Sequence, residues 1–393
     1  YTELTTYDDP RLAEIYGYRP APPTQNPEAL EAWLKYVRAT VERYKDRIKY
    51  WEVWNEPNHR NYWGTIPDGK DYGKLLKVTA LLIREIDPEA IIIGGSMAGI
   101  NPGFTEDFLS VGTADLIDII SYHNYGAIPE GRIYPAVELW EVIDRYNPDI
   151  QLWQGECGYP SHSSTRDYRG ISPWGLNIQS KWLLRQAFTD VYFCKATLSI
   201  YFKLVHLGGR GERQERSMLS PIDSILGFPE RGGSRVRTKG VNEKCLLSNR
   251  DLVPKPAYFT YQNLCAVIDE RYRIKNVDHT IQVLDQGMFY GIGPEDDAFP
   301  SVPLVAGFVT AEDDHLLAYW LPWHPQEYTL ETATINLEIN DCQFEKPVRI
   351  DLLSGKVYQI DNFENKNGKA VFYNLPLSDY PFIIAEQDEI DLN

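Results

Sequence analysis

Cysteine is scarce in this sequence, and its spacing does not fit a disulfide framework or a zinc site. The five cysteines are odd in number, widely spaced and without a C-x-x-C pair. They are Cys157, Cys194, Cys245, Cys265 and Cys342. We therefore expect plain thiols and no metal. The sequence also contains no N-x-S/T sequon, so nothing marks it as a glycosylated secreted protein.

Positive charge is also in short supply. The chain has 39 Lys and Arg against 56 Asp and Glu, which gives a net charge of −17. Nucleic acid and an anionic membrane are thereby excluded as main partners, because phosphate binding needs a basic surface. No apolar run approaches the roughly 18 residues of a membrane span.

The beginning of the chain carries no signal peptide, and its first residue is Tyr1. We therefore expect a processed or truncated chain. A cytoplasmic and an extracytoplasmic bacterial compartment both fit this sequence.

Aromatic residues are abundant, with 26 Tyr and 10 Trp among 393 residues. They fit a large aromatic core, and they equally fit platforms on which sugars or bases stack. The length allows two domains and a sizeable core.

The hydrophobic pattern divides the chain near residue 270. Before that point, apolar runs such as 90–95 alternate with amphipathic stretches, which predicts βαβ units and a parallel sheet. The expected strands are 49–54, 90–95, 116–122, 150–156 and 196–205. The expected helices lie at about 26–41, 71–87, 104–111, 135–146, 175–193 and 255–268. Residues 1–27 and 207–254 are expected to be loops. Short alternating strands dominate 271–393, which predicts an antiparallel β-sandwich as a second domain.

Two glutamates stand where predicted strands end. Residues 50–54 are apolar or aromatic apart from Glu52, and Pro57 cannot donate to a sheet, so the strand should end at or before Glu56. Glu156 ends the run 150–156 in the same way. A strand-end glutamate alone is more often a capping or salt-bridging residue. A pair facing each other across a barrel is what glycosidic bond cleavage requires, with one carboxyl group protonated and the other ionised.

The stretch 51–58, Trp-Glu-Val-Trp-Asn-Glu-Pro-Asn, together with Trp63, resembles the clan A retaining glycoside hydrolases. It is most similar to family 39, which contains β-xylosidases and α-L-iduronidases. The stretches 181–186, 255–258 and 351–355 resemble the same group. The resemblance implies a TIM (β/α)8 barrel over residues 1–270, followed by the sandwich, with no cofactor.

The resemblance also implies roles for individual residues. Glu56 on the fourth barrel strand would be the acid/base, and Glu156 on the seventh would be the nucleophile. Asn55 would bind the sugar 2-hydroxyl, while His123 and Tyr125 would line the pocket and contact the nucleophile. Four tryptophans are candidate sugar platforms, two of which we expect to be simple core residues: Trp54, Trp63, Trp153 and Trp174.

The assignment of 49–54 as the fourth strand leaves no room for three strands before it. We therefore expect the first three barrel strands to be missing from this chain, with at most five present and another chain or fragment supplying the rest. The loop 210–239 carries seven positive and four negative residues. It fits a clamp for uronate or sulfate, and more readily a solvated loop or one packed on a partner.

These observations predict a retaining glycoside hydrolase that works by double displacement, exo-acting on xylose-like or uronic acid-containing glycans. The alternatives are an endo-glycanase or a galactosidase or glucosidase of the same clan, and a non-catalytic carbohydrate-binding barrel. Retention predicts carboxyl groups ~5–5.5 Å apart, inversion about 8 Å, and more than about 10 Å would exclude the site.

Overall fold

The computed structural model describes residues 2–4, 22–64, 66–125, 128–161, 174–205, 244–248, 252–292 and 302–390. The chain forms two compact units, one of Tyr1–Cys157 with Thr189–Ile200 and the other of Gly158–Phe188 with Tyr201–Asn393. The domain boundary near residue 270 stays a prediction. No helix in the described ranges is long and apolar enough to cross a membrane.

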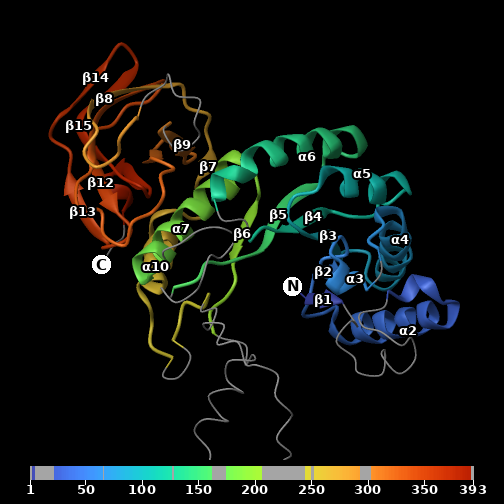
Figure 1. Ribbon diagram of the computed structural model, residues 1–393. Coiled ribbons are helices and arrows are strands. Elements are labelled where there is room, and N and C mark those ends of the chain that lie inside the picture. Colours follow the sequence, from blue (N-terminus) through green and yellow to red (C-terminus); the bar gives the residue numbers. More distant parts are fainter. Residues whose placement is uncertain are drawn as a thin grey trace, which may run out of the picture. The chain divides into compact units, whose positions relative to one another are not determined.

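The first unit is built on a sheet whose strands are neighbours both in sequence and in space (Figure 1). Its strands, in order, are β1 (Thr2–Leu4), β2 (Tyr50–Val53), β3 (Ile91–Ala98), β4 (Ile119–His123), β5 (Gln151–Cys157) and β6 (Leu198–Tyr201). The pairings from β1 through β5 are parallel. Parallel neighbours need a crossover connection, so the α/β class predicted from the sequence is confirmed.

Two expectations about this sheet were wrong. Residues 1–27 were expected to be loop, but Thr2–Leu4 pairs with β2, with Leu4 opposite Val53 and fully buried. The sheet therefore has six strands instead of at most five, and β1 occupies the place directly before the predicted fourth strand. A three-residue strand is too short to show a period, so only its pairing reveals it. Within the described residues no pairing joins β1 to β6, and barrel closure stays a prediction.

Four of the helices described in the first unit follow the sequence expectations closely, whereas the short helix Arg60–Trp63 was not expected. The helices are α2 (Pro27–Tyr44), α3 (Arg60–Trp63), α4 (Gly69–Ile86), α5 (Pro102–Ser110) and α6 (Ile133–Tyr146), with the 3-10 turns η1 (Pro23–Gln25) and η2 (Pro129–Arg132) and the π-helical turn η3 (Thr189–Phe193). Asn26 caps α2 by accepting from the amides of Glu28 and Ala29, and Pro27 opens the helix. Helix α2 packs against α4, α4 against α5, and α5 against α6. Their apolar faces and the sheet form one hydrophobic core.

The second unit contains two antiparallel sheets, as the sequence predicted. Their strands are β7 (Arg273–Ile274), β8 (His279–Asp285), β9 (Leu304–Val309), β10 (His315–Trp320), β11 (Ala333–Asn340), β12 (Pro347–Asp351), β13 (Lys356–Gln359), β14 (Phe363–Lys366), β15 (Lys369–Leu377) and β16 (Phe382–Glu386). One sheet has the order β13-β12-β16-β10-β9-β7 and the other β14-β15-β11-β8. Strand β11 alternates buried and half-buried residues, the pattern of a strand with one face on the core.

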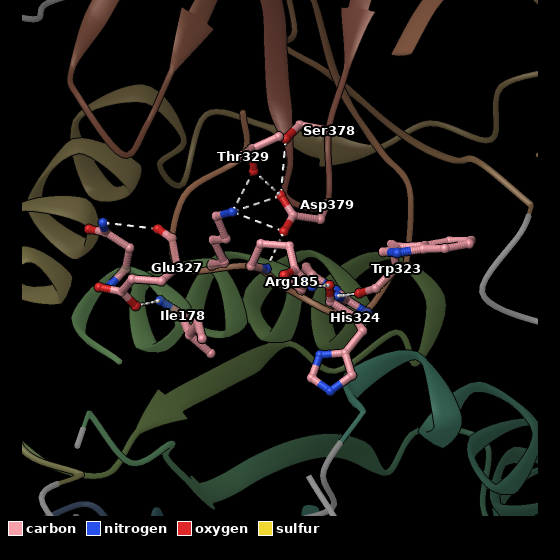
Figure 2. Close-up of polar contacts among 11 residues, drawn as sticks. Ile178, Arg185, Trp323, His324, Glu327, Thr329, Ser378 and Asp379 are labelled. Carbon is pink, nitrogen blue, oxygen red and sulfur yellow. Dashed lines mark hydrogen bonds and ion pairs between the residues drawn. The ribbon is translucent and has the colours of Figure 1, made fainter. Parts of the chain in front are cut away.

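Helices α7 (Leu176–Phe188) and α10 (Pro256–Val267) belong to this second unit and pack on each other. Figure 2 shows how α7 is joined to the loops of the sheets. Lys181 donates to both carboxylate oxygens of Asp379, at 2.8 and 2.9 Å, and to Thr329 at 2.7 Å. Burial lowers the pKa of Lys181 despite the charge of Asp379. Glu327 accepts from the backbone amides at the start of α7, where a carboxylate is favourable.

Candidate active site

Glu56 is held by an unusual backbone path at the end of β2. Trp54 and Glu56 have φ angles of 70° and 45°, in the left-handed region that side chains other than glycine rarely adopt. Such a conformation costs about 1–3 kcal/mol per residue and is found mainly where the surrounding structure enforces it. The amide of Glu56 donates to the carbonyl of Ser96 at 2.9 Å. The loop that carries the carboxylate is thereby tied to β3.

Asn58 provides a second tie between this loop and β3. Its side chain accepts from the amide of Ala98 at 2.7 Å and donates to the Ala98 carbonyl at 3.1 Å. Strand β3 changes register between Gly94 and Met97, and bulges of this kind re-aim side chains near active sites. The two ties fix Glu56 relative to the sheet.

His123 brings the two predicted catalytic carboxylates together. It is the last residue of β4, and its side chain is only 2% exposed. Its Nδ1 lies 3.4 Å from Glu56 Oε1 and 3.7 Å from Glu156 Oε2. These two oxygens are therefore at most about 7 Å apart, the sum of the two distances. That bound lies well inside the ~10 Å at which the proposed chemistry would be excluded.

The charge state of His123 is set by three glutamates. Burial disfavours the charged imidazole, but the hydrogen bond with Glu56 and the charges of Glu156 and Glu52 outweigh it and raise the pKa of His123. Glu52 lies fully buried within β2. The imidazole is therefore protonated more readily than an ordinary histidine, and its positive charge would sit between the two carboxylates.

Tyr125 adds a second contact to the predicted nucleophile. Its hydroxyl donates to Glu156 Oε1, whereas His123 Nδ1 faces Oε2. The last residue of β4 and the second residue after the strand thus lie next to the two oxygens of Glu156. Of the five candidate residues with polar or charged site roles, the structure brings together four: Glu56, Glu156, His123 and Tyr125.

Gly155 allows β5 to approach β4 at this point. A Cβ at residue 155 would lie 2.3 Å from Ser121 Oγ and 3.5 Å from the His123 ring. A Cβ there would clash with the hydroxyl of Ser121, so either that side chain or the strand would have to move. Strand β5 continues to Cys157, so Glu156 is the second-last residue of the strand.

The four candidate tryptophans occupy different environments. Trp54 and Trp63 are fully buried in the core of the first unit and pack edge to face on each other. Trp153 stacks on Tyr50, the first residue of β2, and lines a cavity at the amino-terminal ends of the strands. Trp174 is buried in the second unit beside Trp182. Their positions favour the core interpretation for Trp54, Trp63 and Trp174, and their sugar-stacking role stays a prediction.

Two further expectations are unresolved by the geometry. Asn55 is 7% exposed and adjoins Glu56, and its contact with a sugar hydroxyl stays a prediction. The basic loop 210–239 lies outside the described residues. Among the residues described, no group of three His, Cys, Asp or Glu side chains is arranged to hold a metal ion.

Several residues of this site escaped prediction from the sequence. Asn58 was part of the recognised motif but had no role assigned. Arg132 and Asp190 form a buried ion pair, with 2.6 Å between NH1 and Oδ1, and no sequence pattern singles them out. The pair forms because η2, which contains Arg132, packs next to η3, which contains Asp190.

A pair of neighbouring carboxylates at the carboxyl ends of parallel strands is an arrangement that glycoside hydrolases use, and the comparisons point to the same class. Residues 22–142 match the family model Glycosyl hydrolases family 39. That segment is therefore of glycosidase type, and the predicted resemblance to family 39 is confirmed. It contains Glu56, His123 and Tyr125 and ends before Glu156.

Two curated relatives match about a quarter of the chain. A beta-xylosidase from Geobacillus stearothermophilus is 30% identical over 108 residues, which is 25% of this chain and 21% of that protein. A beta-xylosidase from Caldicellulosiruptor saccharolyticus is 34% identical over 110 residues, 25% of this chain and 22% of that protein. These alignments span about a fifth of the length of either relative.

The fold is shared more widely than the sequence. The crystal structure of the GH39 enzyme from Xanthomonas axonopodis pv. citri superposes with a TM-score of 0.50 at 16% identity, covering 91% of this chain and 73% of that one. At such an identity the likeness concerns the fold alone.

Proposed function

We propose that this protein is a retaining glycoside hydrolase that removes single sugars from xylose-like glycans. The observation that carries the proposal is the position of His123 Nδ1, within 3.4 Å of Glu56 and 3.7 Å of Glu156. Two carboxyl groups this close can act on opposite sides of one glycosidic bond. The match of 22–142 to family 39 supports the same chemistry.

In the proposed first step, Glu156 Oε2 attacks the anomeric carbon while Glu56 protonates the leaving oxygen. The bond between the anomeric carbon and that oxygen breaks, and a glycosyl ester forms on Glu156. The hydroxyl of Tyr125 holds Oε1 of Glu156, which orients the carboxylate for attack. Glu56, now ionised, then takes a proton from water, and the water oxygen displaces Glu156 from the sugar.

His123 serves both carboxylates in this scheme. Its raised pKa reflects their combined charge. A protonated imidazole between them would reduce the repulsion between the two carboxylates when both are ionised.

The sugar is proposed from the relatives, which are named as beta-xylosidases. Uronic acid recognition was inferred from the loop 210–239, which lies outside the described residues, so xylosides are the first choice. We also propose that another chain or fragment supplies the strands that close the sheet into a barrel.

The test uses aryl glycosides, two site variants and one matched control variant. Glu56→Gln and Glu156→Gln should each lower kcat/KM on an aryl β-xyloside by about 10²-fold or more, whereas Glu138→Gln, an exposed change on α6, should leave it unchanged. The first-formed product, followed by proton NMR, should be the β-anomer. An α-anomer, or undiminished hydrolysis by both site variants, would overturn the mechanism. Aryl glucosides, galactosides and uronides tested alongside report the preferred sugar.

A further inference from the structure

A fully buried cation lies directly behind the candidate site. Arg132, in η2, is 1% exposed and donates to three partners. Its NH1 reaches Asp190 Oδ1 at 2.6 Å, while its NH2 reaches the carbonyl of Asn124 at 2.9 Å and Cys157 Sγ at 3.3 Å. A planar guanidinium group with several fixed donors is well suited to hold several acceptors in one geometry.

The partners of Arg132 adjoin the site residues in sequence. Asn124 stands between His123 and Tyr125, and Cys157 follows Glu156. The thiol of Cys157 also donates to the carbonyl of Asn124 at 3.0 Å. One guanidinium therefore links the backbone that carries the histidine and tyrosine to the segment that carries the predicted nucleophile.

Asp190 makes the burial of this cation tolerable. The carboxylate is fully buried in η3, where it also accepts from the hydroxyls of Tyr122 at 3.3 Å and Ser199 at 2.8 Å. Burial raises the pKa of Asp190, and the charge of Arg132 opposes that effect. A buried ion pair is expensive unless further hydrogen bonds support it, and strands β4 and β6 supply two of them to the Asp190 carboxylate. The buried ion pair fixes the position of Arg132, which in turn holds the carbonyl of Asn124 and the thiol of Cys157 in place.

We propose that Arg132, held by Asp190, is a positioning residue that sets the distances among His123, Tyr125 and Glu156. It acts through the carbonyl of Asn124 and the thiol of Cys157. The consequence for turnover rests on the proposed glycosidase function, but the geometric claim does not, because it concerns the two segments and not a substrate.

The first test measures the pKa of His123 by NMR, which needs no turnover. The chain has seven histidines, and His123→Asn assigns the signal. Arg132→Lys keeps the charge but loses the planar fork, so the two segments should separate and the pKa of His123 should fall toward 6.5, its ordinary value. Arg145→Lys, an exposed change on α6, is the matched control and should leave that pKa unchanged.

Cys157→Ala is a milder second variant that leaves the ion pair intact. It removes one of the two links, so the pKa of His123 should fall in the same direction by less. This variant keeps the test decisive should Arg132→Lys fail to fold. The proposal is overturned if the pKa of His123 is unchanged in Cys157→Ala and, where that variant folds, in Arg132→Lys.

Kinetics on an aryl β-xyloside give the second readout. Arg132→Lys should lower kcat by up to about 10²-fold, the loss expected of a displacement of about 1 Å, with KM within about twofold of the parent. A purely structural role would lower the melting temperature and leave kcat per folded molecule and the His123 pKa unchanged, which overturns the proposal. Failure of the glycosidase function would appear separately, as equal hydrolysis by Glu156→Gln and the parent, with the NMR result standing on its own.

Discussion

The imidazole of His123 and the carboxylate of Glu56 meet at 3.4 Å although 67 residues separate them in the chain. Two strand ends of a parallel sheet produce this contact, and it links the charge of one residue to that of the other. The stability of the protein should therefore depend on pH through His123.

The folded state should bind a proton at His123 more tightly than the unfolded state, because its pKa is raised above the ordinary value of 6.5. The resulting stabilisation is fully present below pH 6.5 and is lost as the pH rises through the pKa of the folded state. Each unit between the two pKa values corresponds to about 1.4 kcal/mol. We expect the free energy of unfolding in urea to fall between pH 6 and pH 8.5 by a larger amount in the parent than in His123→Gln.

The exposed His324 offers a control for that experiment. His324→Gln should reproduce the pH dependence of the parent. Identical pH profiles for the parent and His123→Gln would mean that the glutamates around His123 do not raise its pKa.

Gly155→Ala should destabilise the protein by about 1–3 kcal/mol, the usual result of adding a methyl group to a packed interior. The new Cβ would fall 2.3 Å from Ser121 Oγ. Adding Ser121→Ala should recover much of the loss, because the clashing atom is then absent. Gly103→Ala on α5 meets its nearest neighbour only at 3.8 Å and should be neutral or slightly stabilising. Thermal unfolding of the four proteins decides, and equal melting temperatures for both single variants would contradict the clash.

Asn58→Ala should lower both stability and activity. It removes the two hydrogen bonds to Ala98 and leaves a backbone amide and carbonyl without them, at a cost of about 1–3 kcal/mol. The loop that carries Glu56 loses its anchor, so kcat on an aryl xyloside should also fall.

The second unit contains a matched control for Asn58. Asn365 pairs in the same two-way fashion with the backbone of Phe344. Asn365→Ala should lower the unfolding temperature by a similar amount and leave kcat unchanged. A loss of activity that is equal in both variants would show that Asn58 has no special effect on Glu56.

Lys181→Met should destabilise the second unit by about 3–5 kcal/mol, because it leaves the buried charge of Asp379 without its partner. Both side chains are at most 2% exposed. Lys369→Met breaks an ion pair that is more than a third exposed on both sides and should cost less than about 1 kcal/mol. Combining Lys181→Met with Asp379→Asn should cost less than Lys181→Met alone plus Asp379→Asn alone, as measured by chemical unfolding. Strictly additive losses would show that the two residues do not interact.

Local sequence accounts well for the elements that have a strong period or clear ends. Pro27 after the capping Asn26 marks the start of α2, and the apolar run at 90–95 marks β3. The short strand at Thr2–Leu4 carries no such signal and depends on its partner β2. Its omission led to the wrong number of strands.

The sequence by itself determined the class of the fold, the family resemblance and the pair Glu56 and Glu156, because these depend on periodicity, turn residues and a motif within a few neighbouring positions. The family resemblance also implied that Tyr125 contacts Glu156, and the structure contains that hydrogen bond. Only the tertiary structure decided that His123 lies between the two carboxylates and that Arg132 and Asp190 are buried behind them. Those contacts join segments that are tens of residues apart, and their distances follow from strand order and from a glycine that permits close approach. No local pattern contains that information, because it arises only when the strands pack.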